Sequence, residues 1–135
     1  MKLDEHLIQA CKDFIAERFP STDVEGAAAM YTEDGQILIS TAPEVINAGT
    51  NLCHEVGAIC EAYKLNKTVT ASACVSRDED GAYLILTPCG ICQERLYIWG
   101  GDLEVAVPAA GDPTQWEMKL LKEVQPYYWA KLFLK

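Results

Sequence analysis

Apolar residues at spacings of three and four predict that the chain begins with an amphipathic helix. The stripe consists of Leu3, Leu7, Cys11, Phe14 and Ile15. Pro20 ends this helix, because proline lacks the N–H that a further helical turn would need. The polar residues that follow, 21–23, predict a loop.

Two apolar runs follow, at residues 26–32 and 36–41, and the short segment between them contains Asp34-Gly35. Asp-Gly between two apolar runs favours a tight turn whose twist matches that of antiparallel strands. This part of the sequence therefore predicts a β-hairpin.

The rest of the chain alternates between helical and extended patterns. Residues 53–65 and 89–99 predict helices, residues 69–75, 82–86 and 103–107 predict strands, and Gly100-Gly101 ends the second of these helices. Residues 114–124 predict a final amphipathic helix, because Trp116, Leu120, Leu121 and Val124 would share one face. This order of elements favours an α/β fold in three layers, with a mixed sheet covered by helices.

Composition bounds the fold and excludes some functions. The 135 residues are enough for one domain, 1–135, and half of them are apolar. A formal net charge of −9 argues against nucleic-acid binding, which depends on lysine and arginine neutralising phosphates. No stretch approaches the roughly 20 apolar residues of a membrane span. Asp4, Glu5 and Asp13 also stand where a signal peptide would be apolar, so we expect a cytoplasmic protein.

The six cysteines are expected to be free thiols or metal ligands in such a compartment. Cys89 and Cys92 form a Cys-x-x-Cys pair at a strand-to-helix junction, and Cys53 lies at the start of another predicted helix. Helix N-termini favour thiolates, because their N–H groups and dipole stabilise negative charge. Cys53, Cys89 and Cys92 are therefore candidate zinc ligands.

No fourth protein ligand follows from the spacing. Cys60 would lie about 10.5 Å along the helix from Cys53, at 1.5 Å per residue. His54 is adjacent to Cys53 and would point elsewhere. Three protein ligands with an open position are typical of a catalytic zinc ion rather than a structural one. We therefore expect one Zn²⁺ per chain.

The sequence Cys-His-Glu at 53–55, followed after 32 residues by Pro-Cys-Gly-Ile-Cys at 88–92, resembles the cytidine deaminase superfamily. Within it, the chain is similar to the small three-cysteine cytidine deaminases and to the blasticidin S deaminases. The resemblance implies a three-layer α-β-α fold with a central mixed five-stranded sheet. It also implies a hydrolase that converts free cytidine or deoxycytidine to the uracil form and releases ammonia.

The resemblance also implies roles for individual residues. Cys53, Cys89 and Cys92 would hold zinc, and Glu55 would be the catalytic acid and base. His54 and Thr87 would contact the base of a small-molecule substrate through their backbones. A homotetramer, or at least a dimer, is implied as well, and the small residues at positions 57 and 58 would permit a close neighbour.

Departures from the family pattern concern the sugar and the metal charge. In the loop that usually holds the ribose, only Glu44 remains, while Ala42 and Val45 replace polar residues. Val56 stands where many three-cysteine members carry an arginine that offsets the thiolate charge, and Arg95 is the nearest replacement.

Three functional interpretations stay open. Tyr127 and Trp129 resemble the Tyr-x-Trp that ends blasticidin S deaminases, so they are candidate substrate contacts. A blasticidin S-type deaminase is therefore the alternative to a cytidine deaminase, and a non-catalytic zinc-binding module is the third possibility. The remaining cysteines, Cys11, Cys60 and Cys74, are interpreted as core residues.

Overall fold

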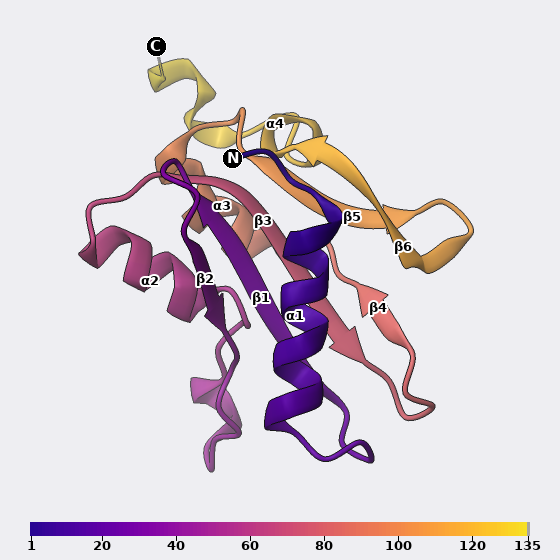
Figure 1. Ribbon diagram of the computed structural model, residues 1–135. Helices are drawn as coiled ribbons and strands as arrows, with labels where there is room; N and C mark the ends of the chain where they lie inside the picture. Colours follow the sequence, from indigo (N-terminus) through magenta and orange to yellow (C-terminus); the bar gives the residue numbers. More distant parts are fainter. Residues whose placement is uncertain (135) are drawn as a thin grey trace.

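A six-stranded mixed sheet with helices on both faces organises the computed structural model, which describes residues 1–134 (Figure 1). The strands are β1 (Glu25–Thr32), β2 (Ile37–Ser40), β3 (Val69–Arg77), β4 (Tyr83–Ile85), β5 (Glu104–Ala109) and β6 (Asp112–Leu120). The α-helices are α1 (Glu5–Arg18), α2 (Val56–Lys64), α3 (Gly90–Leu96) and α4 (Leu121–Val124). Short 3₁₀ turns occupy Ala48–Thr50, Tyr97–Trp99 and Trp129–Phe133.

The sheet has the order β2-β1-β3-β5-β6, and β4 pairs with β3. β1 is antiparallel to both β2 and β3, whereas β3 and β5 are parallel. β4 pairs with the C-terminal part of β3 through Val75–Ile85, and β5 pairs with its N-terminal part through Ala71–Glu104. Parallel neighbours need a crossover connection, and α3 lies within the one that joins β3 to β5.

The predicted hairpin is confirmed. β1 and β2 pair antiparallel with Tyr31 opposite Ile37, and the N–H of Gly35 donates to the carbonyl of Thr32 at 3.0 Å. Gly35 has a φ of +83°, a conformation that glycine adopts without the clash that a side chain would cause.

The helix predicted over residues 114–124 is wrong. Residues 112–120 form β6, which pairs antiparallel with β5, and only Leu121–Val124 is helical. Its apolar residues do not share one face: Trp116 packs with the core under α1, whereas Leu121 and Val124 belong to the core on the opposite face of the sheet. The additional strand makes the sheet six-stranded instead of five-stranded.

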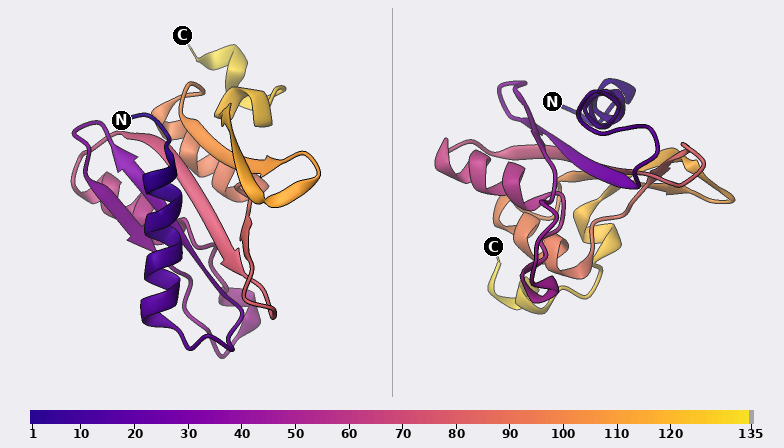
Figure 2. Two further views of the ribbon diagram at one scale, coloured as in Figure 1. Left: turned by 45° about the vertical axis from the view of Figure 1, so that its right-hand side comes forward. Right: turned by 90° about the horizontal axis from the view of Figure 1, so that it is seen from below.

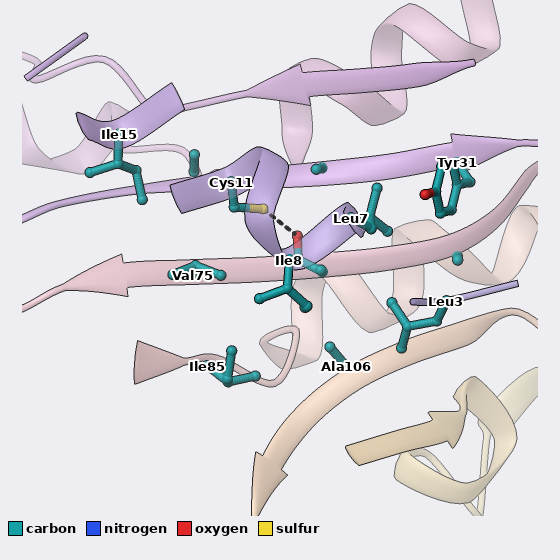
Figure 3. Close-up of a cluster of buried hydrophobic side chains, with 13 residues drawn as sticks. Leu3, Leu7, Ile8, Cys11, Ile15, Tyr31, Val75, Ile85 and Ala106 are labelled. Carbon is teal, nitrogen blue, oxygen red and sulfur yellow. Dashed lines mark hydrogen bonds between the residues drawn. The ribbon is translucent and has the colours of Figure 1, made fainter. Parts of the chain in front are cut away.

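The three-layer arrangement is confirmed, with α1 on one face of the sheet and α2 and α3 on the other (Figure 2). Figure 3 shows the core under α1, where Leu7, Ile8, Cys11 and Ile15 lie against the sheet. Asp4 caps α1 by accepting a hydrogen bond from the N–H of Leu7 at 3.0 Å. No helix within residues 1–134 is long and apolar enough to cross a membrane.

The face of the sheet that carries α2 and α3 also carries the cysteine cluster. Along β3, Ala71, Ala73 and Val75 point into the α1 core, so Ser72 and Cys74 point the other way. The second core, around Met30, Ile59 and Leu96, fixes α2 and α3 beside each other on that face. The sheet is thus the common support for the starts of both helices.

Candidate active site

Three cysteine sulfurs converge where α2 and α3 begin. The Sγ atoms of Cys53, Cys89 and Cys92 all lie within 4.8 Å of one another, and those of Cys53 and Cys89 are 3.2 Å apart. A tetrahedral zinc ion with Zn–S bonds of about 2.3 Å separates its sulfur ligands by about 3.8 Å. The three thiols therefore fit a zinc ion in number, chemistry and spacing, and these are the three cysteines selected from the sequence.

The start of α3 explains why Cys89 is the most acidic thiol of the cluster. Cys89 is the N-cap residue of α3, preceded by Pro88, and its carbonyl accepts the N–H of Gln93 at 2.8 Å. Burial acts to raise the pKa of the Cys89 thiol, but hydrogen bonds from the backbone N–H of Cys92, from the Cys53 thiol and from the backbone N–H of Ile91 together outweigh it and lower the pKa. This thiol is pre-organised to ionise and bind a metal.

At the other two cysteines, burial is the dominant effect on the pKa. It raises the pKa of the Cys53 thiol and of the fully buried Cys92 thiol. The guanidinium of Arg95 counteracts this at Cys92, because its Nη1 donates to Cys92 Sγ at 3.8 Å and favours the thiolate. The replacement charge suggested by the sequence thus lies against the cluster, one helical turn after Cys92.

Glu55 is 4% exposed and lies at the N-cap position of α2, but its carboxylate makes no capping hydrogen bond. The capping role falls to Ser40 at the end of β2, whose Oγ accepts from the N–H of Ala58 at 2.9 Å. Burial raises the pKa of Glu55, an effect that backbone and Cys74 hydrogen bonds and the charge of Arg95 partly offset. A carboxyl group of raised pKa beside a metal-binding cluster is suited to proton transfer near neutral pH.

A cavity of about 210 Å³ joins these groups. Its lining residues are Leu52, Cys53, His54, Glu55, Cys74, Leu86, Thr87 and Cys89. His54 and Thr87, predicted from the sequence to contact the base, therefore border the same space as Glu55 and two of the three thiols.

Cys74 is the member of this cavity that sequence reasoning missed, since it was expected to be an ordinary core residue. It is buried, but it projects from the face of β3 that carries the cluster and lines the same cavity as Glu55. Side chains alternate between the two faces of a strand, so the sequence of β3 could have placed Cys74 on the face opposite Ala73. Cys11 is a core residue as predicted, whereas the same prediction for Cys60 is wrong, because Cys60 is exposed on α2.

The structure does not bring the other predicted substrate contacts into this cavity. Glu44 lines a separate cavity of about 450 Å³ together with Arg18, Asp23 and Ala42. Tyr127 is 94% exposed. Trp129 is 68% exposed, and its Nε1 donates to Glu94 at 3.1 Å.

The chain is similar in sequence to known proteins. No protein-family model matches the chain. It is 34% identical over 77 residues to the cytidine deaminases of two Mycobacterium tuberculosis strains, CDC 1551 / Oshkosh and H37Rv. These matches cover 56% of this chain and 54% of each relative, so the chain spans about half the length of the curated relatives that it matches.

Solved structures extend the similarity to nearly the whole chain. The crystal structure of the cytidine deaminase from Bacillus anthracis is 44% identical, with a TM-score of 0.85, covering 96% of this chain and 91% of that one. The cytidine deaminase from Mycobacterium leprae, at 23% identity and a TM-score of 0.70 over 93% of this chain and 99% of that one, shares the fold. With the three-cysteine cluster in place and 44% identity over almost the full length, the chain belongs to the cytidine deaminase family.

Proposed function

We propose that this chain is a zinc-dependent hydrolase that deaminates a free cytosine nucleoside, such as cytidine or deoxycytidine, with release of ammonia. The observation that carries the proposal is the placement of the Glu55 carboxylate in one cavity with Cys53 and Cys89. A metal-binding module without catalysis has no need of a buried carboxylate there. The family similarity supports the same activity.

In this proposal Cys53, Cys89 and Cys92 would hold the ion beside the cavity that Glu55 lines. Zinc, when bound, acts as a Lewis acid that lowers the pKa of water toward ~7. Glu55 takes a proton from the attacking water and delivers one to the ring nitrogen of the base. It then takes the remaining proton from the hydroxyl that the water has added to the ring carbon and passes it to the amino group, which leaves as ammonia when the C–N bond breaks and the carbonyl forms. The backbone groups of His54 and Thr87 orient the base at the cavity wall.

Substituting Glu55 by Gln tests the chemistry separately from metal binding. E55Q should keep its zinc and its fold but lose about 10²–10⁴-fold in turnover of cytidine, because the acid–base group is gone. Ultraviolet assays of deamination and metal analysis of the same sample measure both. The matched control is E61Q on the exposed side of α2, which should keep wild-type turnover. An E55Q enzyme as fast as E61Q would remove Glu55 from the mechanism.

Substituting Cys89 by Ser tests the ligand set. C89S should lose most of its bound zinc, because Cys89 is the most readily ionised thiol of the three. C60S, at an exposed cysteine of α2, is the control and should retain one zinc ion per chain. Full zinc retention in C89S, measured by metal analysis, would contradict the assignment.

A blasticidin S-type deaminase is the second candidate, and the loop before α2 favours considering it. Ala42 and Val45 offer no side-chain hydrogen bond to a ribose, and Glu44 lies outside the cavity at the cluster. We therefore expect the aminopyrimidine to be accepted and selectivity for the sugar to be relaxed. Values of kcat/KM for cytidine, deoxycytidine and blasticidin S decide between a cytidine deaminase and a blasticidin S-type deaminase. Strong discrimination among sugar-modified cytidines would show that other groups of the loop hold the ribose.

A homotetramer, or at least a dimer, remains our proposal for the assembly. Of the two small residues on α2, Ala58 is buried within the chain, whereas Gly57 is exposed. Further support comes from large apolar side chains that a single chain leaves exposed. They include Ile46, Leu52, Ile91, Tyr127, Trp129 and Leu132.

In such an assembly Glu44, Tyr127 and Trp129 would contact substrate from the rim of the site or from a neighbouring subunit. Light scattering at micromolar concentration measures the state, and a particle of 14.9 kDa would contradict the proposal. We also place the protein in the cytoplasm, because free thiols persist in a reducing compartment. The proposed reaction, deamination of a free cytosine nucleoside, would belong to pyrimidine salvage.

A further inference from the structure

The imidazole of His54 connects the start of α2 to the loop that follows β2. Its Nδ1 accepts a hydrogen bond from the backbone N–H of Ala42 at 3.1 Å, and Thr41 Oγ1 lies 3.5 Å from the same nitrogen. Because Nδ1 accepts from a backbone N–H, the ring carries its proton on Nε2. The side chain therefore acts as a hydrogen-bond acceptor for the loop rather than as a free group in the cavity.

Gly26 in β1 provides the space for this ring. A methyl group at position 26 would lie 2.5 Å from His54 Nε2, closer than van der Waals contact permits. The main chain of His54 is held as well, because its carbonyl accepts from the hydroxyl of Ser40 at 2.5 Å. The ring and backbone of His54 are thus both fixed to the segment from Ser40 to Ala42.

This contact lies between two hollows of the molecule. His54 lines the cavity at the thiol cluster, whereas Thr41, Ala42 and Glu44 line the cavity of about 450 Å³. The bond between His54 and Ala42 joins the walls of these two cavities. A substrate whose base lies in the first cavity and whose remaining part extends toward the second would pass this junction.

We propose that the His54 side chain is a positioning residue that fixes the Thr41–Glu44 segment relative to the thiol cluster and thereby sets the affinity for the part of the substrate beyond the base. The proposal rests on the deaminase function proposed above. His54 makes no contact with the reacting atoms through its ring, so its side chain affects KM and leaves kcat largely unchanged.

The pair of variants His54→Asn and His54→Leu tests this role. The Oδ1 atom of asparagine can take the place of Nδ1 and keep the acceptor for Ala42, whereas leucine fills a similar volume without an acceptor. Hydrogen exchange at the Ala42 amide reads the contact directly and needs no catalysis. We expect about two- to tenfold faster exchange in H54L and near wild-type exchange in H54N. Amides within α2 serve as the internal control, because a general loss of folding would accelerate them too.

Kinetics with zinc-loaded enzyme provide the second measurement. H54L should raise KM for cytidine by about two- to tenfold while kcat stays within about threefold of wild type, and H54N should restore KM. Wild-type exchange at Ala42 in H54L, a fall in kcat at constant KM, or failure of H54N to restore KM would each overturn the proposal. Wild-type protein that deaminates no cytosine compound would instead refute the proposed function, and the exchange result would still decide whether His54 holds the loop.

Discussion

The hydroxyl of Ser40 accepts a hydrogen bond from the N–H of Ala58 at 2.9 Å, and so it caps a helix to which it does not belong. Side-chain caps usually come from the residue that begins the helix, which here is Glu55. Because Ser40 takes that role from the neighbouring strand, the carboxylate of Glu55 does not cap α2 and is available to the cavity at the thiol cluster.

Replacing Ser40 by Ala should destabilise the protein, because it removes an N-cap. The same change removes the hydrogen bond to the His54 carbonyl, so the loss should lie at the upper end of the ~0.5–2 kcal/mol range. Urea unfolding of metal-free protein measures it. Ser21→Ala in the exposed turn after α1 is the control, and equal midpoints for both variants would show that Ser40 is not a cap.

Replacing Gly57 by Ala should also destabilise the protein, although alanine is the better helix former by ~1 kcal/mol. A methyl group at position 57 would lie 2.8 Å from Ser40 Cβ, and overpacking of this kind costs about 1–3 kcal/mol. Steric conflict should therefore outweigh helix propensity. Gly90→Ala in α3 is the matched control, because a methyl group there meets no atom within 4 Å. A stabilised G57A variant in thermal unfolding would show that α2 can move away from β2.

Replacing Arg95 by Gln should weaken zinc binding, since the thiolate of Cys92 would lose the guanidinium that lies 3.8 Å away. A hydrogen bond to a charged group contributes about 1.5–3 kcal/mol, so we expect roughly ten- to a hundredfold lower affinity. Competition with a chromophoric chelator gives the affinity without relying on activity. Lys119→Gln, which removes one positive charge from an exposed strand position, separates the local effect from that of net charge. Equal affinities in the two variants would exclude Arg95 from the metal site.

The interactions of Asp34 predict that the folded state loses stability in acid at the β1–β2 hairpin. A hydrogen bond from the Thr32 hydroxyl and the Lys67 ammonium at 2.9 Å lower the pKa of Asp34 to about 2. Because this pKa lies below the ordinary value of about 3.9, ionised Asp34 stabilises the folded state above pH ~4. That contribution is lost as the pH falls through the folded-state pKa. Asp34→Asn should therefore lower the melting temperature at pH 7, and its difference from wild type should shrink as the pH falls toward the folded-state pKa of about 2. A constant difference across this range would contradict the assignment.

Local patterns in the sequence were sufficient for part of the fold and of the site. The first helix, the Asp34-Gly35 hairpin and the Cys89–Cys92 pair depend on neighbours a few positions apart, so periodicity and turn chemistry reveal them. Residues 114–124 were misassigned, because an apolar spacing of three and four ran across the end of a strand into a short helix. Helical and extended residues contributed to one apparent stripe.

The parts that could not be predicted depend on the pairing of distant segments. Ser40 meets Ala58 and Cys74 meets Glu55 only because the sheet places β2 and β3 beside the start of α2. No local pattern encodes such contacts. Cys53, Cys89 and Glu55 could nevertheless be selected as candidates, because their residue types and spacing resemble the zinc deaminase signature, and the structure brings them to one cavity.

The separation of Cys53 and Cys89 along the chain has a consequence for how the protein folds. These residues are 36 positions apart, and the chain between them supplies all of α2, β3 and β4. Contacts that close long loops through a sheet form slowly, since the entropy of loop closure opposes them until the strands have paired. We therefore expect the metal centre to be completed late, after β3 has joined β1. An unfolded chain would then keep these thiols apart, so zinc should bind only after the sheet has formed and should slow unfolding more than it speeds folding.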